Sequence, residues 1–168
     1  MTTPFIPYAE RSLPQRIQEI RLLIMEMEDV LAPAGADPIE PDPADLAGLE
    51  RWRAAGGLVV ITARADYQAA RDFCAAHDLA FQAHRGDKDH VVRTAIVENS
   101  ARADNACYLG VTKDDLPAMI TAGVSAAVAT DDPWVSGGAH IAIEAAGCAG
   151  AVAELVDRLM ADGALSQG

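Results

Sequence analysis

The sequence predicts a doubly wound α/β fold, a parallel sheet with helices on both faces. Short apolar runs rich in Val, Ile and Leu recur along the chain, and helix-like stretches separate them. A parallel strand can return only through a crossover, so this alternation favours a parallel sheet. Each run is too short for an independent helix, and the expected strands are 20–25, 58–61, 79–82, 106–109, 125–129 and 140–143.

The stretches between these runs carry the periodicity of helices. Apolar side chains recur at the spacing of a buried helical stripe in 88–99 and again in 149–160. The expected helices are 44–54, 67–77, 88–99, 115–122 and 149–160. Residues 32–43 hold four prolines and a glycine, which exclude regular structure through most of that segment. We therefore expect a loop directly after the first strand.

Length and composition fit one domain. The chain has 168 residues, of which 51% are hydrophobic, so it has enough apolar material for a core. We find no internal repeat and expect no second domain. The predicted organisation is an N-terminal extension over residues 1–19, an α/β domain over 20–162 and a flexible tail over 163–168.

Charge and cysteine content exclude several classes of function. The net charge is −12, and no basic cluster is dense enough to follow a nucleic-acid backbone. Prolines and charges interrupt the first residues, so we expect no signal peptide, membrane span or membrane partner. The three cysteines are far apart and unlike a disulfide or metal framework, so we interpret them as small buried hydrophobes in a reducing cytoplasm.

Chemistry is expected where the strands end, because ligands of open parallel sheets bind outside the carboxyl ends of the strands. Glu26, Glu28 and Asp29 follow the first predicted strand, and Thr62 follows the second. Lys88 opens a predicted helix, and a glycine turn with acids, 110–117, follows the fourth strand. The four histidines show no metal-ligand spacing, and we assign no chemistry to His77, His84, His90 and His140.

The same segments resemble a known family in order. Residues 22–31, Leu-Leu-Ile-Met-Glu-Met-Glu-Asp-Val-Leu, resemble the first motif of the 3-deoxy-D-manno-octulosonate 8-phosphate phosphatases of the haloacid dehalogenase (HAD) superfamily, an apolar strand followed by Asp-x-Asp-Gly-Val. Residues 59–64, Lys88 and residues 108–117 resemble the later motifs. The resemblance, over residues 20–160, implies a Rossmann-like HAD fold without a large cap domain, and a homo-oligomer, a tetramer in that family.

The resemblance also implies roles for particular residues. In that superfamily the first aspartate attacks phosphorus and the second is the general acid and base, and these positions are Glu26 and Glu28. Thr62 and Lys88 match the residues that grip phosphate, and Asp115 matches a retained acid. These five form the candidate catalytic site, in degenerate form.

The departures from the family fall on the reacting groups. A glutamate adds a methylene, and a misplacement of ~1 Å costs an in-line displacement on the order of 100-fold. Asp29 replaces a glycine and adds negative charge where a phosphate dianion would dock. Val111 and Thr112 replace acids that complete a Mg²⁺ site, and valine offers no ligand. We therefore assign no metal residue and expect Mg²⁺ only if Asp114 and Asp115 rebuild a site.

Simpler interpretations remain open for the same residues. The acids after the first strand fit a solvated turn, and Thr62 fits a helix cap as well as a phosphate ligand. Considered without the other motifs, Lys88 fits a solvated surface lysine. Asp114 and Asp115 fit an N-cap and a first-turn acid as well as a metal site.

Three functions follow as hypotheses. The favoured one is a pseudoenzyme that keeps the phosphatase fold and binds a protein partner, its own copies or a small ligand. The alternative is a divergent metal-dependent phosphatase of a small sugar phosphate, with Glu26 as nucleophile. The third is a structural subunit of an assembly.

Overall fold

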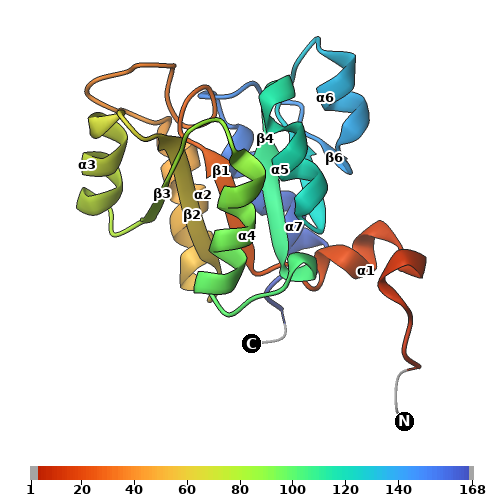
Figure 1. Cartoon of the computed structure of the whole chain (residues 1–168). Coiled ribbons are helices and arrows are strands. Elements are labelled where there is room, and N and C mark those ends of the chain that lie inside the picture. Colours follow the sequence, from red (N-terminus) through yellow and green to blue (C-terminus); the bar gives the residue numbers. More distant parts are fainter. Residues whose placement is uncertain (1–3, 167–168) are drawn as a thin grey trace.

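The computed structural model describes residues 4–166 and confirms the predicted parallel sheet (Figure 1). All six strands run parallel in the order β3-β2-β1-β4-β5-β6. Their bounds are β1 Leu22–Glu26, β2 Leu58–Arg64, β3 Ala80–His84, β4 Ala106–Gly110, β5 Val124–Ala127 and β6 Ile141–Ala142. Residues 1–3 of the predicted extension and 167–168 of the predicted tail lie outside the described residues.

Helices cover both faces of the sheet, as predicted (Figure 1). One face carries α2 (Pro43–Ala54), α3 (Gln68–Ala76) and α7 (Ala151–Ala161). The other carries α4 (Lys88–Glu98), α5 (Leu116–Thr121) and α6 (Pro133–Gly138). The fold is therefore doubly wound α/β.

The central strand β1 shows why the apolar runs form strands. Every residue of β1 is buried. Leu23 and Met25 pack into the core under α2 and α7, whereas Leu22 and Ile24 pack into the core under α4 and α5. A strand covered on both faces needs apolar side chains at successive positions, which explains an uninterrupted run instead of an alternating one.

The packed region extends beyond the predicted domain limits of 20 and 162. Upstream lie the 3₁₀ turn η1 (Tyr8–Glu10) and the helix α1 (Leu13–Ile17). Ile17 is buried, and the Tyr8 hydroxyl donates a hydrogen bond of 2.7 Å to the Gly123 carbonyl. Downstream of α7, Ala164 is buried in the same core as Ile17. Segments predicted as an extension and a tail thus contribute to the fold.

Short elements differ most from the sequence prediction. The strands β5 and β6 are shorter than expected, and two further 3₁₀ turns occur at η2 (Ala103–Asn105) and η3 (Lys113–Asp115).

Trp52 is a buried packing anchor whose Nε1 donates to the Leu58 carbonyl. Trp134 on α6 is 68% exposed instead. Within residues 4–166, we find no helix that is both long and apolar enough to span a membrane.

Candidate functional site

The site lies at the carboxyl edge of the sheet, where the strands end. Glu26 is the last residue of β1, Arg64 of β2 and His84 of β3. Because these strands are parallel neighbours, all three side chains reach the same edge. Together with Lys88 at the start of α4 and Val111 after β4, they line a cavity of about 810 Å³. A volume of this size suits a small molecule.

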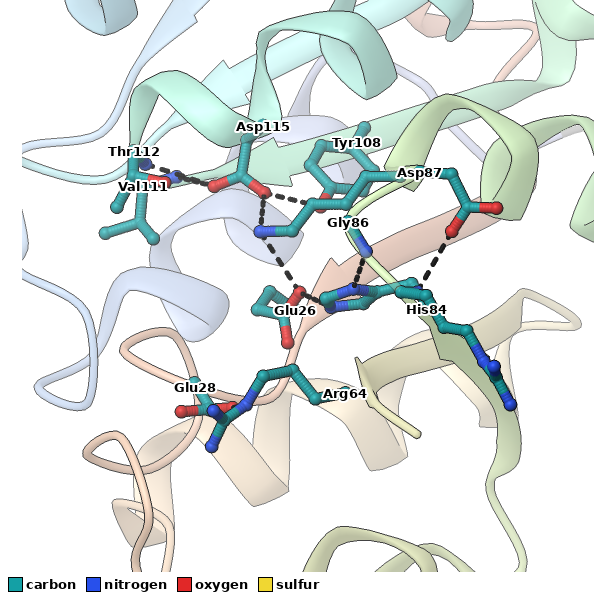
Figure 2. Close-up of polar contacts among 12 residues, drawn as sticks. Glu26, Glu28, Arg64, His84, Gly86, Asp87, Tyr108, Val111, Thr112 and Asp115 are labelled. Atoms are coloured by element: carbon teal, nitrogen blue, oxygen red, sulfur yellow. Dashed lines mark hydrogen bonds and ion pairs between the residues drawn. The ribbon is translucent and has the colours of Figure 1, made fainter. Parts of the chain in front are cut away.

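Glu26 is held by two groups of the protein itself (Figure 2). Its side chain is buried, and Oε2 lies 2.8 Å from Nε2 of His84. The same oxygen lies 3.3 Å from Nζ of Lys88. Oε1 makes no hydrogen bond with the residues that the structure describes, and Figure 2 shows it on the side of Arg64 and Glu28.

The hydrogen bonds of His84 determine its tautomer. The backbone N–H of Gly86 donates to Nδ1 of His84 over 3.2 Å, so Nδ1 carries a lone pair. The proton of the neutral ring therefore lies on Nε2, which donates to Glu26. His84 is a neutral donor that fixes the Glu26 carboxylate.

Asp115 is completely buried and accepts four hydrogen bonds. Oδ2 accepts from the backbone N–H groups of Val111 at 2.8 Å and Thr112 at 3.0 Å. Oδ1 accepts from the Tyr108 hydroxyl at 2.7 Å and from Nζ of Lys88 at 2.9 Å. Four donors satisfy the carboxylate, so Asp115 anchors the turn after β4.

Lys88 is the cation that joins the two buried carboxylates. Burial by itself lowers the pKa of Lys88, but the nearby carboxylates of Asp115 and Glu26 outweigh it and raise that pKa. Burial raises the pKa of Tyr108 well above its ordinary value, and the adjacent carboxylate of Asp115 adds to the shift. Lys88 is therefore charged and Tyr108 protonated at neutral pH. Lys88 is buried, so the alternative interpretation of it as a solvated surface lysine is wrong.

The acids after Glu26 are more open. Nε of Arg64 donates to Oε1 of Glu28 at 3.0 Å, and the Glu28 side chain is 15% exposed. Asp29 has a φ of +63°, the left-handed conformation that favours glycine, and its Oδ1 accepts from the backbone N–H of Ala34. The backbone at this position thus has a conformation typical of glycine, although the residue carries a carboxylate side chain. A solvated turn fits Asp29 but not the buried Glu26.

Thr62 lies beneath the surface of the cavity. The residue is completely buried within β2, and among the described residues its hydroxyl has no hydrogen-bond partner. The helix α3 begins after Tyr67, so Thr62 does not cap it, and that interpretation is wrong. Its hydroxyl does not line the cavity either.

The side chains present offer Mg²⁺ few free oxygen ligands. A protein usually holds Mg²⁺, in nearly octahedral geometry at about 2.1 Å, through one or two carboxylates together with water. Within the described part of the chain, no three His, Cys, Asp or Glu side chains converge to hold an ion. Val111 contributes no oxygen ligand from its side chain, Asp115 is fully hydrogen-bonded, and one oxygen of Glu26 already serves His84 and Lys88.

Three members of this network were not predicted from the sequence. His84, Tyr108 and Arg64 received no role, although each contacts a predicted site residue. The signal available for His84 was its position just past the predicted third strand. Because β3 continues two residues further than predicted, its last side chain reaches the cavity beside Glu26.

Neither a protein-family model nor a curated protein matches the sequence, whereas solved structures do. The cobalt-bound deoxy-D-mannose-octulosonate 8-phosphate phosphatase of Haemophilus influenzae matches with a TM-score of 0.81 and 22% identity, over 89% of this chain and 92% of that one. A hydrolase assigned to subfamily III A of the HAD superfamily, from Legionella pneumophila, matches with a TM-score of 0.79 and 24% identity, over 90% and 87%.

A third structure carries ligands. The 3-deoxy-D-manno-octulosonate 8-phosphate phosphatase of Moraxella catarrhalis, solved with magnesium, phosphate and KDO, matches with a TM-score of 0.75 and 18% identity, over 89% of this chain and 90% of that one. At such identities the likeness establishes architecture and leaves the chemistry to the residues present. The chain has the Rossmann-like fold of the HAD phosphatases, as its sequence resemblance predicts.

Proposed function

We propose that this chain is a HAD-like pseudoenzyme, which keeps a phosphatase fold and acts by binding instead of phosphoryl transfer. The contacts of Glu26 carry the proposal. The carboxylate in the nucleophile position is buried and fixed by His84 and Lys88 through one of its oxygens. In-line attack on phosphorus depends on positioning to within about 1 Å, and a glutamate fixed here holds its carboxylate one methylene further from the backbone than an aspartate does.

The surroundings of Asp115 support the same proposal. Phosphoryl transfer needs groups that neutralise the charge that develops on the phosphate oxygens. The backbone donors of Val111 and Thr112 are directed to Asp115 instead, and Lys88 is shared between two carboxylates. The groups that would stabilise a phosphate are thus used within the protein.

One observation favours the alternative of a divergent phosphatase of a small sugar phosphate. Glu26 lines the cavity, and among the described residues Oε1 has no hydrogen-bond partner. One carboxylate oxygen therefore remains for a reaction. Against this alternative, Val111 and Thr112 stand where the resembling family has the acids that complete its Mg²⁺ site.

The proposed binding function includes a cellular location and an oligomeric state. Burial raises the pKa of Cys74 and of Cys107 to about 12, so both thiols stay protonated and inert at neutral pH. Free buried thiols fit the reducing cytoplasm that we propose as the location. We also propose that the chain forms a homo-oligomer, as the family that the sequence resembles does, or binds a protein partner.

Calorimetric titration with Mg²⁺, followed by a hydrolysis screen over sugar phosphates that includes 3-deoxy-D-manno-octulosonate 8-phosphate, tests the proposal. We expect neither a saturable Mg²⁺ isotherm nor phosphate release. Saturable Mg²⁺ binding together with turnover that Glu26→Gln abolishes would contradict the proposal and establish the divergent phosphatase.

A further inference from the structure

The cavity at the carboxyl edge is rich in carboxylates. Five of its lining side chains are acids, and three are cationic. The acids are Glu26, Glu28, Asp29, Asp66 and Asp114, and the cations are Arg64, Arg85 and Lys88. With His84 neutral, the lining has an excess of negative charge. The whole chain, at −12, adds a long-range field of the same sign.

Most of the positive charge is already used inside the protein. Lys88 contacts Glu26 and Asp115, and the Nε of Arg64 donates to Glu28. Only the Arg85 side chain has no hydrogen bond or ion pair among the residues described. The backbone N–H groups after β4 are also occupied. An anionic ligand would therefore meet few available donors and several carboxylates.

Free acceptors, in contrast, remain at the cavity. Glu26 is 4% exposed, yet it lines the cavity, and its Oε1 has no hydrogen-bond partner in the part of the chain described. Asp114 is exposed on the turn after β4 and also lines the cavity. Oε1 of Glu26 is open to the cavity and is not engaged by a donor among the described residues, so a cationic ligand that donates a charge-assisted hydrogen bond to it gains affinity.

The spacing of the acids distinguishes between kinds of cation. A metal ion needs ligand atoms that converge on one point at about 2–2.6 Å. No three acid, His or Cys side chains converge in this way within residues 4–166. The carboxylates come instead from separate segments, after β1, β2 and β4. Separated acceptors match a ligand that carries several charged N–H groups along a chain.

We propose that this cavity binds a linear di- or polyamine, whose ammonium groups contact Glu26, Glu28 or Asp29, and Asp114. The inference deepens the proposed binding function by naming the ligand class, and it rests on that function. The cavity of about 810 Å³ is large enough for such a chain. Charge-assisted hydrogen bonds from ammonium to carboxylate supply both orientation and affinity.

Calorimetric titration of the full chain with spermidine, at an ionic strength of about 0.15 M that screens distant charges, tests the inference. We expect saturable binding to one site. Glu26→Gln and Asp114→Asn each remove one charged acceptor and weaken binding about tenfold or more. Glu50→Gln removes an exposed acid of α2 outside the cavity and is the matched control, with unchanged affinity.

Three results would overturn the inference: no spermidine binding, equal weakening in the Glu50→Gln control, or binding of inorganic phosphate in place of spermidine. Thermal unfolding shows whether Glu26→Gln folds, and if it does not, Asp114→Asn decides because its side chain is exposed. If the chain neither binds spermidine nor hydrolyses a phosphate ester, only the proposed ligand class is refuted. If it hydrolyses a phosphate ester, the proposed function itself is refuted.

Discussion

Lys88 supplies a single positive charge to two buried carboxylates, Glu26 and Asp115. The rest of their stabilisation comes from neutral donors, namely His84, Tyr108 and two backbone N–H groups. Removing one partner of such a buried network leaves a charge without compensation, which costs far more than an exposed pair. The network is therefore a structural part of the fold at neutral pH.

Stability should fall at alkaline pH because of this network. The pKa values of Tyr108 and Lys88 are raised in the folded chain, so the folded state keeps protons that the unfolded state loses. The contribution is complete below the ordinary pKa values and is lost as pH rises above about 10. Urea unfolding across this range should show a falling midpoint, with a shallower fall in Tyr108→Phe. An identical pH dependence in the two proteins would refute the role of Tyr108.

Thr62 is a predicted site residue that does not line the cavity, and a substitution tests the effect of its buried hydroxyl on stability. Its buried hydroxyl has no partner among the described residues, so replacing it with a methyl group removes an unsatisfied polar atom. We expect Thr62→Val to be as stable as wild type or up to about 1 kcal/mol more stable. Chemical denaturation measures this difference, and a loss of stability would show that the hydroxyl has a partner.

At the scale of elements, α7 is capped by a residue of another helix. Gly150 precedes α7 and has no side chain to cap it. Asp45, on the first turn of α2, is completely buried, and its carboxylate accepts from the N–H groups of Gly150 at 3.2 Å and Ala153 at 3.0 Å. The contact joins two helices 105 residues or more apart in sequence.

Asp45→Ala should therefore destabilise the chain by about 2 kcal/mol, because it leaves partly buried N–H groups at the start of α7 without an acceptor. The matched control is Asp157→Ala on the surface of α7, where an exposed pair with Arg51 contributes at most about 0.5 kcal/mol. Urea unfolding of both variants gives the comparison. Equal losses would show that Asp45 does not cap α7.

The main elements could be predicted from sequence because their signals are local. The apolar run of β1 and the helical stripe in α4 each lie within a dozen residues. The hydrogen bond from His84 to Glu26 joins residues 58 apart, and that from Lys88 to Asp115 joins residues 27 apart. Periodicity contains no information on such pairs, so positions at strand ends were predicted and their partners were not. The tautomer of His84 depends on a backbone contact that only the structure shows.

At the scale of the whole molecule, assembly stays a prediction. Val97, Ile120 and Trp134 are 77%, 82% and 68% exposed on α4, α5 and α6, the helices of one face. Exposed large apolar side chains on one face favour a contact with another surface. Light scattering at working concentration should show a homo-oligomer, and a monomer would contradict the assembly.

The Glu26 carboxylate is part of a buried network, and we propose that it does not transfer phosphoryl groups. The measurement is phosphate release from a panel of sugar phosphates, at saturating Mg²⁺ and high protein concentration, with Glu26→Gln as the background control. We expect equal, background-level release from wild type and from Glu26→Gln. Release by wild type that is well above the variant would contradict it.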